Sequence, residues 1–382
     1  MVLAPTLATG ARSPAIRRQR DRDGKRSLPP VDPTRVWVTV LIPAHNEGNQ
    51  ITETISSLKS QERRPDRVIV ITDNCTDATA GLAQLCGAEV IATRGNRHKK
   101  AGALNQVLHR LLPMLGPEDA VLVMDADSAL DRGFIRNGVN YLATGRYAAV
   151  GGTFTGKPGG GMVGTFQRNE YARYARDVRR LSGKALVLTG TATLFRALTL
   201  QEVVAARASG RLPDGDHVYD VRVLTEDNEL TLAILHLHLR ILCPRECTLT
   251  TEVMTTWGDL ARQRLRWKRG ALENLTDYGW TSVTRAYWGR QLLSLIGIIV
   301  TFTYLATVAY SLVWLGGIRL SPLWTTITAI FILERVITVR SRGVAQMAIA
   351  SVLFVEMLFD VFLQVVQAKA FWDTAWRKER KW

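Results

Sequence analysis

Short apolar runs alternate with amphipathic segments over the first third of the chain. Apolar runs of about four to eight residues predict buried strands, and apolar positions spaced three or four apart predict helices. Strands that alternate with helices predict an α/β fold with a mostly parallel, Rossmann-like sheet covered by helices on both faces. The expected strands are 36–42, 67–71, 89–92 and a run that begins at Val121, and the expected helices end near Leu58, Leu85 and Leu112.

Polar residues interrupt the pattern directly after these strands, most clearly where the run from Val121 ends in Asp125 and Asp127. In open α/β sheets ligands bind outside the carboxyl ends of the strands, so the breaks should meet at one edge. Two carboxylates beside a buried strand are costly unless a cation lies there. Mg²⁺ or Mn²⁺ fits, with water and substrate phosphates as further ligands. Two solvated aspartates in a loop are the alternative for so short a pattern.

The pattern is weaker between residues 151 and 211. The glycine run 156–161 lacks the Gly-Lys-Ser/Thr ending of a phosphate-binding loop, so a flexible loop is expected there. A helix is predicted over 167–181. The run 186–191 is predicted to be a strand that leads into a turn.

A basic amphipathic helix is predicted from Trp257 to Leu275, and an interfacial helix lying on a membrane is one interpretation of it. The segment 292–315 is apolar, uncharged and long enough to span a bilayer, and a second apolar segment covers 322–333. The third, 344–366, carries acids on one helical face. It is therefore either a packed span or an amphipathic helix at the interface. These acids and the neighbouring amide are Glu356, Asp360 and Gln364.

Basic residues bear on how often the chain crosses the membrane. Arg335, Arg340 and Arg342 indicate a cytoplasmic turn after the second apolar segment. The basic residues at 377–381 favour the same side. Two spans with an interfacial third segment satisfy both observations, whereas three spans put the basic end outside.

The net charge of +15 fits nucleic acid, an anionic membrane surface or anionic substrates as partners. Much of this charge lies beside the membrane segments or at the predicted donor site, which argues against a nucleic-acid-binding protein. Residues 1–35 are expected to form a disordered basic tail that either touches anionic lipid or plays no part. The four cysteines fit no zinc spacing and are expected to be free thiols.

Six short motifs follow one another in an order that resembles the family 2 glycosyltransferases, whose nucleotide-sugar-binding fold is called GT-A. The resemblance runs from about residue 36 to the C-terminus. The last motif, Gln-x-x-Arg-Trp, is similar to one found in membrane synthases of cellulose, chitin, hyaluronan and poly-N-acetylglucosamine. The motifs are Pro43-Ala44-His45-Asn46-Glu47, Asp73-Asn74-Cys75-Thr76-Asp77, Lys100-Ala101-Gly102-Ala103-Leu104-Asn105, Asp125-Ala126-Asp127, Thr225-Glu226-Asp227 and Gln263-Arg264-Leu265-Arg266-Trp267.

The resemblance implies roles for the donor side. Asp73 and the turn that contains Glu47 would hold the nucleoside, although an Asx-turn is the plain alternative for Asp73. Lys100 would pair with a phosphate, or be a solvated lysine. Asp127 would ligate the metal directly, and Asp125 would support it or bond the ribose. The other residues of this donor set are Pro43, His45, Asn46, Gln263 and Arg266.

The acceptor side follows in the same way. Asp227 would be the general base that takes the acceptor's proton, and Glu226 would help to shape the site; helix capping is the alternative for Asp227. Gly190 and Thr191 correspond to the acceptor pocket. Trp267 offers a ring on which an acceptor sugar can stack.

Together these features predict a membrane-bound inverting hexosyltransferase with a cytoplasmic catalytic domain and a multi-pass anchor in the cell membrane. UDP-N-acetylglucosamine is the expected donor and a β-linked polysaccharide the expected acceptor, with transfer to a polyprenyl-phosphate lipid as the alternative. So few spans leave room for a small partner subunit that completes an export pore. The expected division is a tail at 1–35, a GT-A domain at 36–255, interfacial helices at 256–290, membrane segments at 291–368 and a basic tail at 369–382.

Overall fold

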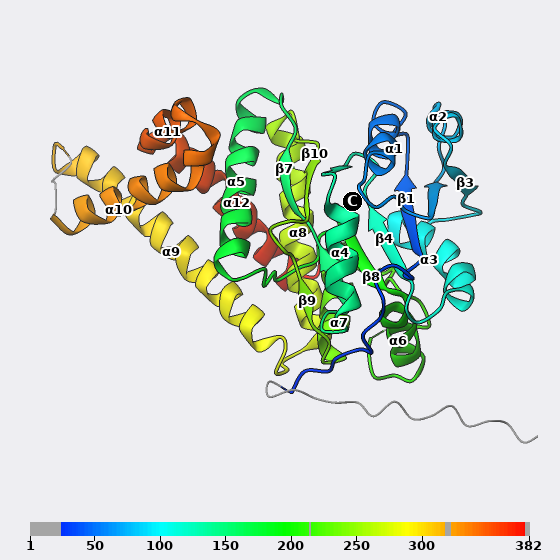
Figure 1. Cartoon of the computed structure of the whole chain (residues 1–382). Helices are drawn as coiled ribbons and strands as arrows, with labels where there is room; N and C mark the ends of the chain where they lie inside the picture. The colour runs from blue at the N-terminus through cyan, green and yellow to red at the C-terminus, as the bar shows by residue number, and fades with distance from the viewer. Residues whose placement is uncertain (1–23, 214, 318–321, 379–382) are drawn as a thin grey trace, which may run out of the picture.

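The structure is a computed structural model, and it describes residues 24–213, 215–317 and 322–378. A seven-stranded sheet forms its centre, with the strand order β3-β2-β1-β4-β8-β6-β9 (Figure 1). These strands span Glu89–Ala92, Arg67–Thr72, Val38–Ala44, Ala120–Met124, Ala192–Arg196, Ala149–Gly151 and Ile241–Leu242. The sheet is parallel apart from β8, which runs antiparallel to both of its neighbours. The predicted α/β architecture is confirmed.

Helices cover both faces of the sheet, and two apolar clusters join them to it. Their bounds are Ile51–Lys59 (α1), Thr79–Leu85 (α2), Phe134–Ala143 (α4), Lys99–Leu111 (α3), Ala197–Ala208 (α6) and Glu226–His236 (α7). The first three pack on one face and the last three on the other. The central strands β1 and β4 are almost fully buried, because a layer of helices covers each side.

The carboxyl ends of the parallel strands β1, β2 and β4 share one edge of the sheet, as their ladder pairings require. A second, three-stranded sheet consists of β5 (Ala129–Leu130), β10 (Thr248–Thr251) and β7 (Thr153–Gly156). Strand β5 follows closely on the end of β4, so this small sheet is tied by the chain to the edge where the polar motifs lie. Both sheets therefore border the edge at which the polar motifs lie.

Two of the predicted element boundaries are wrong near the site. Strand β1 continues through Pro43 to Ala44 rather than ending at Ile42, and β4 pairs with it only as far as Leu41. Pro43 thus has a paired strand on one side only, where its missing N–H costs no ladder bond. Helix α5, Gly161–Arg180, begins at the end of the glycine run rather than at Gln167.

The predicted strand 186–191 is also wrong. This segment is a loop, and the strand that follows it, β8, begins only at Ala192. Side chains hold the loop in place of a strand ladder. The backbone N–H of Leu188 donates to Thr231 Oγ1 on α7 at 3.0 Å, and Thr193 Oγ1 donates to the carbonyl of Thr189 at 2.9 Å.

Residues 24–35 lie against the domain, so the disordered tail predicted for 1–35 is too long; residues 1–23 lie outside the described residues. Leu28 is buried, and its N–H donates to the carbonyl of Gly145 at 2.7 Å. Gly145 has a φ of +70°, and a Cβ there would lie 2.3 Å from the carbonyl oxygen of Leu28. Arg26 pairs with Glu202 at 2.5 Å. These contacts tie the segment to α6 and to the end of α4.

The helices after the α/β domain are α8 (Trp257–Tyr278), α9 (Arg285–Trp314), α10 (Pro322–Val339), α11 (Val344–Ser351) and α12 (Leu353–Ala375). Short 3-10 turns lie at Leu112–Met114 and Arg340–Arg342. The single segment predicted over 344–366 is wrong, because the chain leaves the helical conformation at Val352. The tail expected from residue 369 is likewise helical as far as Ala375.

Helix α12 packs along α8. Phe359 is buried and stacks on Phe166 of α5 with the ring centroids 4.8 Å apart. Lys268 donates to Gln367 at 2.8 Å, and Asp360 pairs with Arg335 of α10 at 2.7 Å. The acid at position 360, which the sequence placed on one face of the segment, is therefore used for packing inside the protein.

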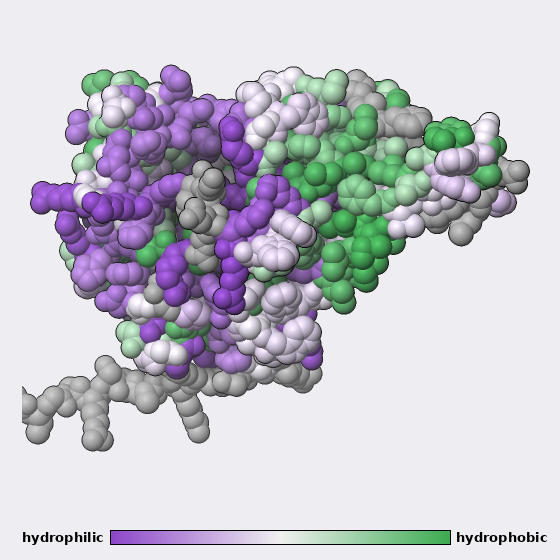
Figure 2. Space-filling view, turned by 180° about the vertical axis from the view of Figure 1, so that it is seen from behind, coloured by the Kyte–Doolittle hydropathy of each residue, from purple (hydrophilic) through white to green (hydrophobic). Residues whose placement is uncertain are grey.

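Among the described residues one helix, α9, is long and apolar enough to cross a membrane. It projects away from the sheet, and apolar surface covers this end of the molecule (Figures 1 and 2). Its exposed large apolar residues include Leu292, Leu293, Ile296, Ile299, Val300, Leu312, Val313 and Trp314. A patch of this extent is typical of a membrane or protein contact. The two or three membrane helices predicted from the sequence are thus found as one helix of spanning length.

Candidate active site

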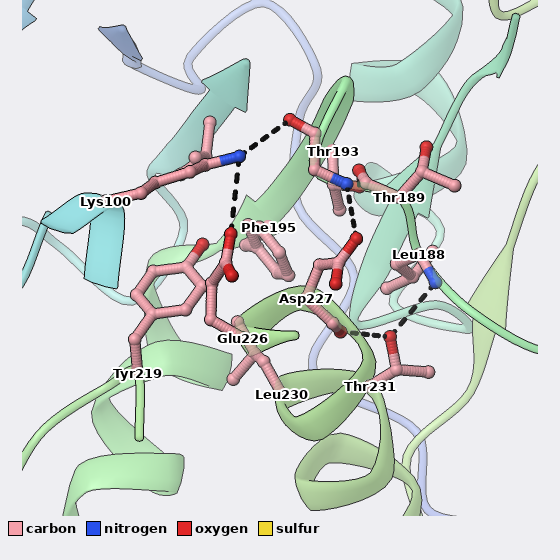
Figure 3. A pocket seen from close by; sticks show the side chains of 12 residues that line it. Lys100, Leu188, Thr189, Thr193, Phe195, Tyr219, Glu226, Asp227, Leu230 and Thr231 are labelled. Atoms are coloured by element: carbon pink, nitrogen blue, oxygen red, sulfur yellow. Dashed lines mark hydrogen bonds and ion pairs between the residues drawn. The ribbon is translucent and has the colours of Figure 1, made fainter. Parts of the chain in front are cut away.

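Lys100 lies at the centre of the polar edge. It is in the first turn of α3, and its ammonium bonds Asp125 at the end of β4. Glu226 at the start of α7 lies 3.5 Å from the same nitrogen, and the carbonyl of Gly190 accepts from it at 3.4 Å (Figure 3). Three elements far apart in the sequence therefore meet around one cation. The charge of Lys100 offsets the cost of holding two carboxylates close together.

Gly190 joins this group to Asp227. Its N–H donates to Asp227 Oδ2 at 2.9 Å, and the N–H of Asn228 donates to Oδ1 at 2.7 Å. A Cβ at position 190 would lie 2.6 Å from the Lys100 nitrogen, so a larger residue there would push the ammonium of Lys100 away. Thr191 bonds Thr189 through their hydroxyls at 2.8 Å. The backbone of Gly190 therefore connects Lys100 and Asp227.

Asp227 has the properties of a base that works near neutral pH. Burial, and next the charge of Glu226, raise its pKa to about 6, against the opposing effects of Lys100 and the two N–H donors. A carboxylate with this pKa is ionised at pH 7 and still takes a proton readily. Thr225 holds the capping position of α7, and Asp227 accepts one N–H of the first turn, that of Asn228, so its carboxylate also serves the start of the helix.

Carboxylates gather where the metal was predicted. Burial, and next the charge of Asp125, raise the pKa of Asp127 to about 6. Burial and the charges of these two aspartates raise the pKa of Glu47 to about 7. Asp127 accepts only long hydrogen bonds, from Ser128 at 3.2 Å and Thr251 at 3.3 Å. Such mutual repulsion between hard oxygen ligands is relieved by a divalent cation.

The described residues hold no group of three or more His, Cys, Asp or Glu side chains that could by itself hold a metal ion. Asp125 and Asp127 would therefore supply two ligands at most, and the remainder would be water and phosphate oxygens. Mg²⁺ is commonly held in this way, by one or two carboxylates together with substrate phosphates. The residues present thus fit a metal that binds together with a nucleotide.

Asp73 lies where the resemblance puts the nucleoside contact, at the end of β2. One of its carboxylate oxygens accepts from Thr93 at 2.7 Å and from Asn74 at 3.1 Å. His45 bonds the Asp73 carbonyl at 2.6 Å. Asn46 has a φ of +57° and accepts from the N–H of Thr76 at 2.8 Å. The turns after β1 and β2 therefore form one rigid unit.

Asp77 has a local role in that unit. Its carboxylate accepts from the N–H of Thr79, the first residue of α2, at 3.0 Å, while the capping position of the helix itself is Ala78. It also accepts from the N–H of Gly48 at 3.0 Å, which ties the two turns together. Because Asp77 performs this structural task, the second oxygen of Asp73 is left for a ligand.

Helix α8 brings the Gln-x-x-Arg-Trp motif to the other side of the site. Gln263 accepts a bond from Arg264, and the Arg264 guanidinium lies over the Trp267 ring at 4.3 Å. Arg264 is buried and pairs with Glu170 of α5 at 2.7 Å. One face of Trp267 is thus covered by Arg264. The charge of Arg266 contributes, after burial, to a lowered pKa of Lys99, so Arg266 lies near the start of α3.

Several residues at the site were not predicted from the sequence. Tyr219 lies beside Lys100 and Glu226, and Asn105 holds its backbone through two hydrogen bonds of 2.7 and 3.0 Å (Figure 3). A cavity of about 10 Å³ lies below Asp227, with room for about one water molecule. The cavity is lined by Lys100, Val123, Leu188, Thr189, Gly190, Thr193, Phe195, Tyr219, Glu226, Asp227, Leu230 and Thr231.

Comparison with known proteins agrees with this geometry. A family model described as glycosyltransferase like family 2 matches residues 33–270. The poly-beta-1,6-N-acetyl-D-glucosamine synthase of Staphylococcus aureus (strain MSSA476) is 25% identical over 282 residues, which cover 70% of this chain and 64% of the synthase. The synthase of the same name from Staphylococcus epidermidis is 23% identical over 257 residues, which cover 64% of this chain and 57% of that protein. The chain thus spans less than two thirds of the length of these relatives.

A solved structure shares the fold over nearly the whole length. The mannosyltransferase PcManGT from Pyrobaculum calidifontis, solved in complex with GDP-Man and Mn²⁺, superposes with a TM-score of 0.60 at 17% identity. The match covers 92% of this chain and 90% of that one. It therefore includes most of the helices that follow the α/β domain.

Proposed function

The chain belongs to the glycosyltransferase-like family 2, and from that premise we propose that it is a metal-dependent, inverting hexosyltransferase that adds sugars from a UDP-sugar to a β-linked polysaccharide at a membrane. The observation that carries this proposal is the meeting of Lys100, Asp125 and Asp227 around Gly190. It brings a phosphate partner, a metal ligand and a base to one cleft. UDP-N-acetylglucosamine is the proposed donor because of the name of the staphylococcal relatives.

On the donor side, Asp73 accepts from the uracil or ribose through its remaining carboxylate oxygen. Lys100 and Arg266 lie near the start of α3, where they hold the diphosphate. Asp125 and Asp127 would hold Mg²⁺ or Mn²⁺, and the metal of PcManGT supports that choice. When bound, the metal neutralises the negative charge that develops on the leaving diphosphate.

On the acceptor side, Asp227 takes the proton from the attacking hydroxyl. The N–H of Gly190 and that of Asn228 hold its two oxygens, so the carboxylate is oriented before the substrate arrives. Attack from the side opposite the diphosphate inverts the anomeric carbon and converts an α-linked donor into a β-linked product. Glu226 raises the pKa of Asp227 and so makes it a better base.

Replacing Trp267 by alanine should separate transfer from donor hydrolysis. The ring face that Arg264 leaves uncovered is the proposed platform for an acceptor sugar, a contact of about 1–2 kcal/mol. The rate of transfer at low acceptor concentration should fall roughly 5- to 30-fold. Slow hydrolysis of the donor by water, which needs no platform, should be spared. Both rates are measured as UDP release, with and without acceptor.

Trp280→Ala is the matched control, because Trp280 is 71% exposed and lies beyond the end of α8. It should leave both rates unchanged. If Trp267→Ala lowered hydrolysis and transfer in equal proportion while folding normally, Trp267 would not be the acceptor platform.

The membrane attachment follows from α9 and α12. Helix α12 packs on α8, so it lies on the same side of the membrane as the catalytic domain. If α9 crosses the bilayer, the chain must cross back before α12. We assign the return crossing to α10, which with 18 residues is the longest described helix between them, although α9 is the one described helix with the length and hydropathy of a span. We therefore propose a hairpin of α9 and α10, with the catalytic domain and α12 on the cytoplasmic face.

Cysteine labelling tests this topology. A cysteine at Trp376, which is 65% exposed, or at Arg262 should be protected from a membrane-impermeant thiol reagent in intact cells and labelled after permeabilisation. The parent chain, labelled in parallel, controls for its own cysteines. Labelling of the cysteine at position 376 from outside would mean an odd number of crossings and would exclude the hairpin.

Donor screening of the full-length protein in detergent tests the function. UDP-N-acetylglucosamine with Mn²⁺ should give the fastest nucleotide release, and a β-linked oligosaccharide acceptor should accelerate it. Acceleration by a polyprenyl phosphate instead would identify the alternative acceptor, a lipid carrier. Absence of nucleotide release from every UDP-sugar and GDP-sugar would contradict the proposal.

A further inference from the structure

One face of α8 contacts the start of α7 directly. Gly270, Asn274 and Tyr278 are spaced by four residues and therefore share that face. A Cβ at Gly270 would lie 2.4 Å from Thr225 Oγ1, so the side chain of Thr225 packs directly on the backbone of α8 there. Tyr278 donates to Glu229 of α7 at 2.6 Å. Between these contacts lies Asn274, whose side chain is completely buried.

Asn274 bonds the residues on either side of the base. Its amide nitrogen donates to Asn228 Oδ1 at 2.9 Å and to the carbonyl of Thr225 at 3.1 Å. Thr225 Oγ1 lies 3.2 Å from the same nitrogen. Asp227 lies between these two partners along the chain. A neutral side chain with two N–H donors is thus aimed at two acceptors, which an aspartate of the same shape would repel.

The start of α7 lacks the usual local support. Thr225 is the capping residue, yet its side chain makes no capping bond to the helix. A threonine at this place normally stabilises the first turn through such a bond. Here its carbonyl and hydroxyl face Asn274 instead. The position of the first turn, and so of Asp227, is therefore supported by α8 as well as by the N–H of Gly190.

The same helix carries the proposed acceptor platform. Trp267 precedes Asn274 by seven residues, two helical turns or about 10.5 Å of rise. Arg264 and Glu170 fix the platform end of α8 against α5 at 2.7 Å. A rigid helix therefore connects the side chain that would hold the acceptor sugar with the one that orients the base.

We propose that Asn274 is a positioning residue that sets the distance and angle between the carboxylate of Asp227 and an acceptor sugar held by α8. This inference rests on the proposed function, in which Asp227 is the base. Its consequence is selective. Transfer to a sugar requires that the Asp227 carboxylate and the acceptor hydroxyl be correctly placed relative to each other. A water molecule is small and can move to meet a displaced carboxylate. Loss of the bonds should therefore lower transfer more than donor hydrolysis.

Asn274→Ala tests the proposal in the full-length enzyme. Misplacement of a catalytic group by about 1 Å costs roughly 10²-fold. Transfer at saturating donor and acceptor should fall about 10- to 100-fold, while the donor KM and the hydrolysis rate stay within about twofold. Thr276→Ala is the control. Thr276 lies on the exposed side of the same helix and bonds only within it. It should change neither rate.

Asn228→Ala provides a second test in case Asn274→Ala does not fold, because it removes the same 2.9 Å hydrogen bond from the other side. It should lower transfer selectively too, and the double variant should be no worse than Asn274→Ala. Equal losses of transfer and hydrolysis, or no loss of transfer, would overturn the proposal and leave Asn274 a structural residue.

Hydrogen exchange separates this proposal from the proposed function. The amides of residues 226–229 should exchange faster in Asn274→Ala than in the parent protein, and those around Trp267 should not. Unchanged exchange at 226–229 would overturn the positioning role whatever the enzyme transfers. If the parent protein released no nucleotide from any donor but exchange rose as expected, the proposed function alone would fail.

Discussion

Replacing Asp227 by asparagine will stop glycosyl transfer while the affinity for the UDP-sugar stays within a few-fold. Asparagine keeps the volume of the side chain and can still accept the N–H of Gly190, but it takes up no proton. Loss of a general base costs about 10²–10⁴-fold, and a disturbed geometry adds to that. The measurements are the transfer rate and the donor affinity by calorimetry.

Asp177→Asn on the exposed surface of α5 makes the same chemical change away from the cleft and should leave both quantities unchanged. If Asp227→Asn kept the parent rate of transfer, the base would have to be sought elsewhere, and Glu226, 3.5 Å from Lys100, would be the next candidate.

The same assignment predicts how the rate depends on pH. Only ionised Asp227 accepts a proton, and its pKa of about 6 means that transfer falls as the pH drops through about 6. Saturating metal should keep its two proposed ligands, Asp125 and Asp127, ionised during the titration. Because the charge of Glu226 raises this pKa, Glu226→Gln should move the acid limb to lower pH. A limb that did not move, or moved upward, would contradict Asp227 as the titrating group.

Asp127→Asn will abolish turnover and weaken metal-dependent UDP binding. Asp127 lies in the turn after the buried strand β4, and burial and next the charge of Asp125 raise its pKa, so the parent site gains more from a cation than the variant does. Loss of one preorganised charge of this kind costs about 10²–10³-fold in rate, and loss of the metal adds to it. Calorimetry of UDP binding with and without Mn²⁺ measures the binding part.

Asp119 provides the control, since it precedes the same strand, β4, at the opposite end and accepts the N–H of Gly116 at 2.8 Å. Asp119→Asn should bind UDP with the same metal dependence as the parent protein. Unchanged metal-dependent binding by Asp127→Asn would exclude Asp127 as a ligand. A chelator should silence the parent enzyme.

The sheet and much of the polar edge could be predicted from the sequence, because both depend on local patterns. A run such as 120–124 is short, apolar throughout and bounded by polar residues, which favours a buried strand, and a parallel sheet then brings the residues after each strand to one edge. The motifs that contain Lys100 and Asp125 were therefore expected at the same edge, but the ion pair between the two side chains was not predicted. The prediction of a strand at 186–191 was wrong because it too used only the local pattern. The apolar residues of this segment resemble a strand, but a hydrogen bond from Leu188 to the distant Thr231 helps to hold it as a loop.

Contacts between distant residues were beyond this reasoning. Arg264 looks like one more exposed basic residue on α8, yet it is buried against Glu170, 94 positions earlier in the chain. Asn274 lies 49 residues from Thr225 and carries no local signal at all. The packing of α12 on α8 could not be foreseen either. The acids of the segment 344–366 were compatible both with a packed span and with an interfacial helix. The structure shows one of them, Asp360, paired with Arg335.

The anomeric configuration of the product tests the central claim, that this cleft transfers a sugar with inversion, most directly. The purified full-length protein would be supplied with UDP-N-acetylglucosamine, in which the sugar is α-linked, together with Mn²⁺ and a sugar acceptor. Proton NMR of the first product would then be recorded. The account predicts a new β-linkage formed together with UDP, and loss of both signals in Asp227→Asn. A new α-linkage would contradict inversion, and transfer by Asp227→Asn at the parent rate would contradict the base.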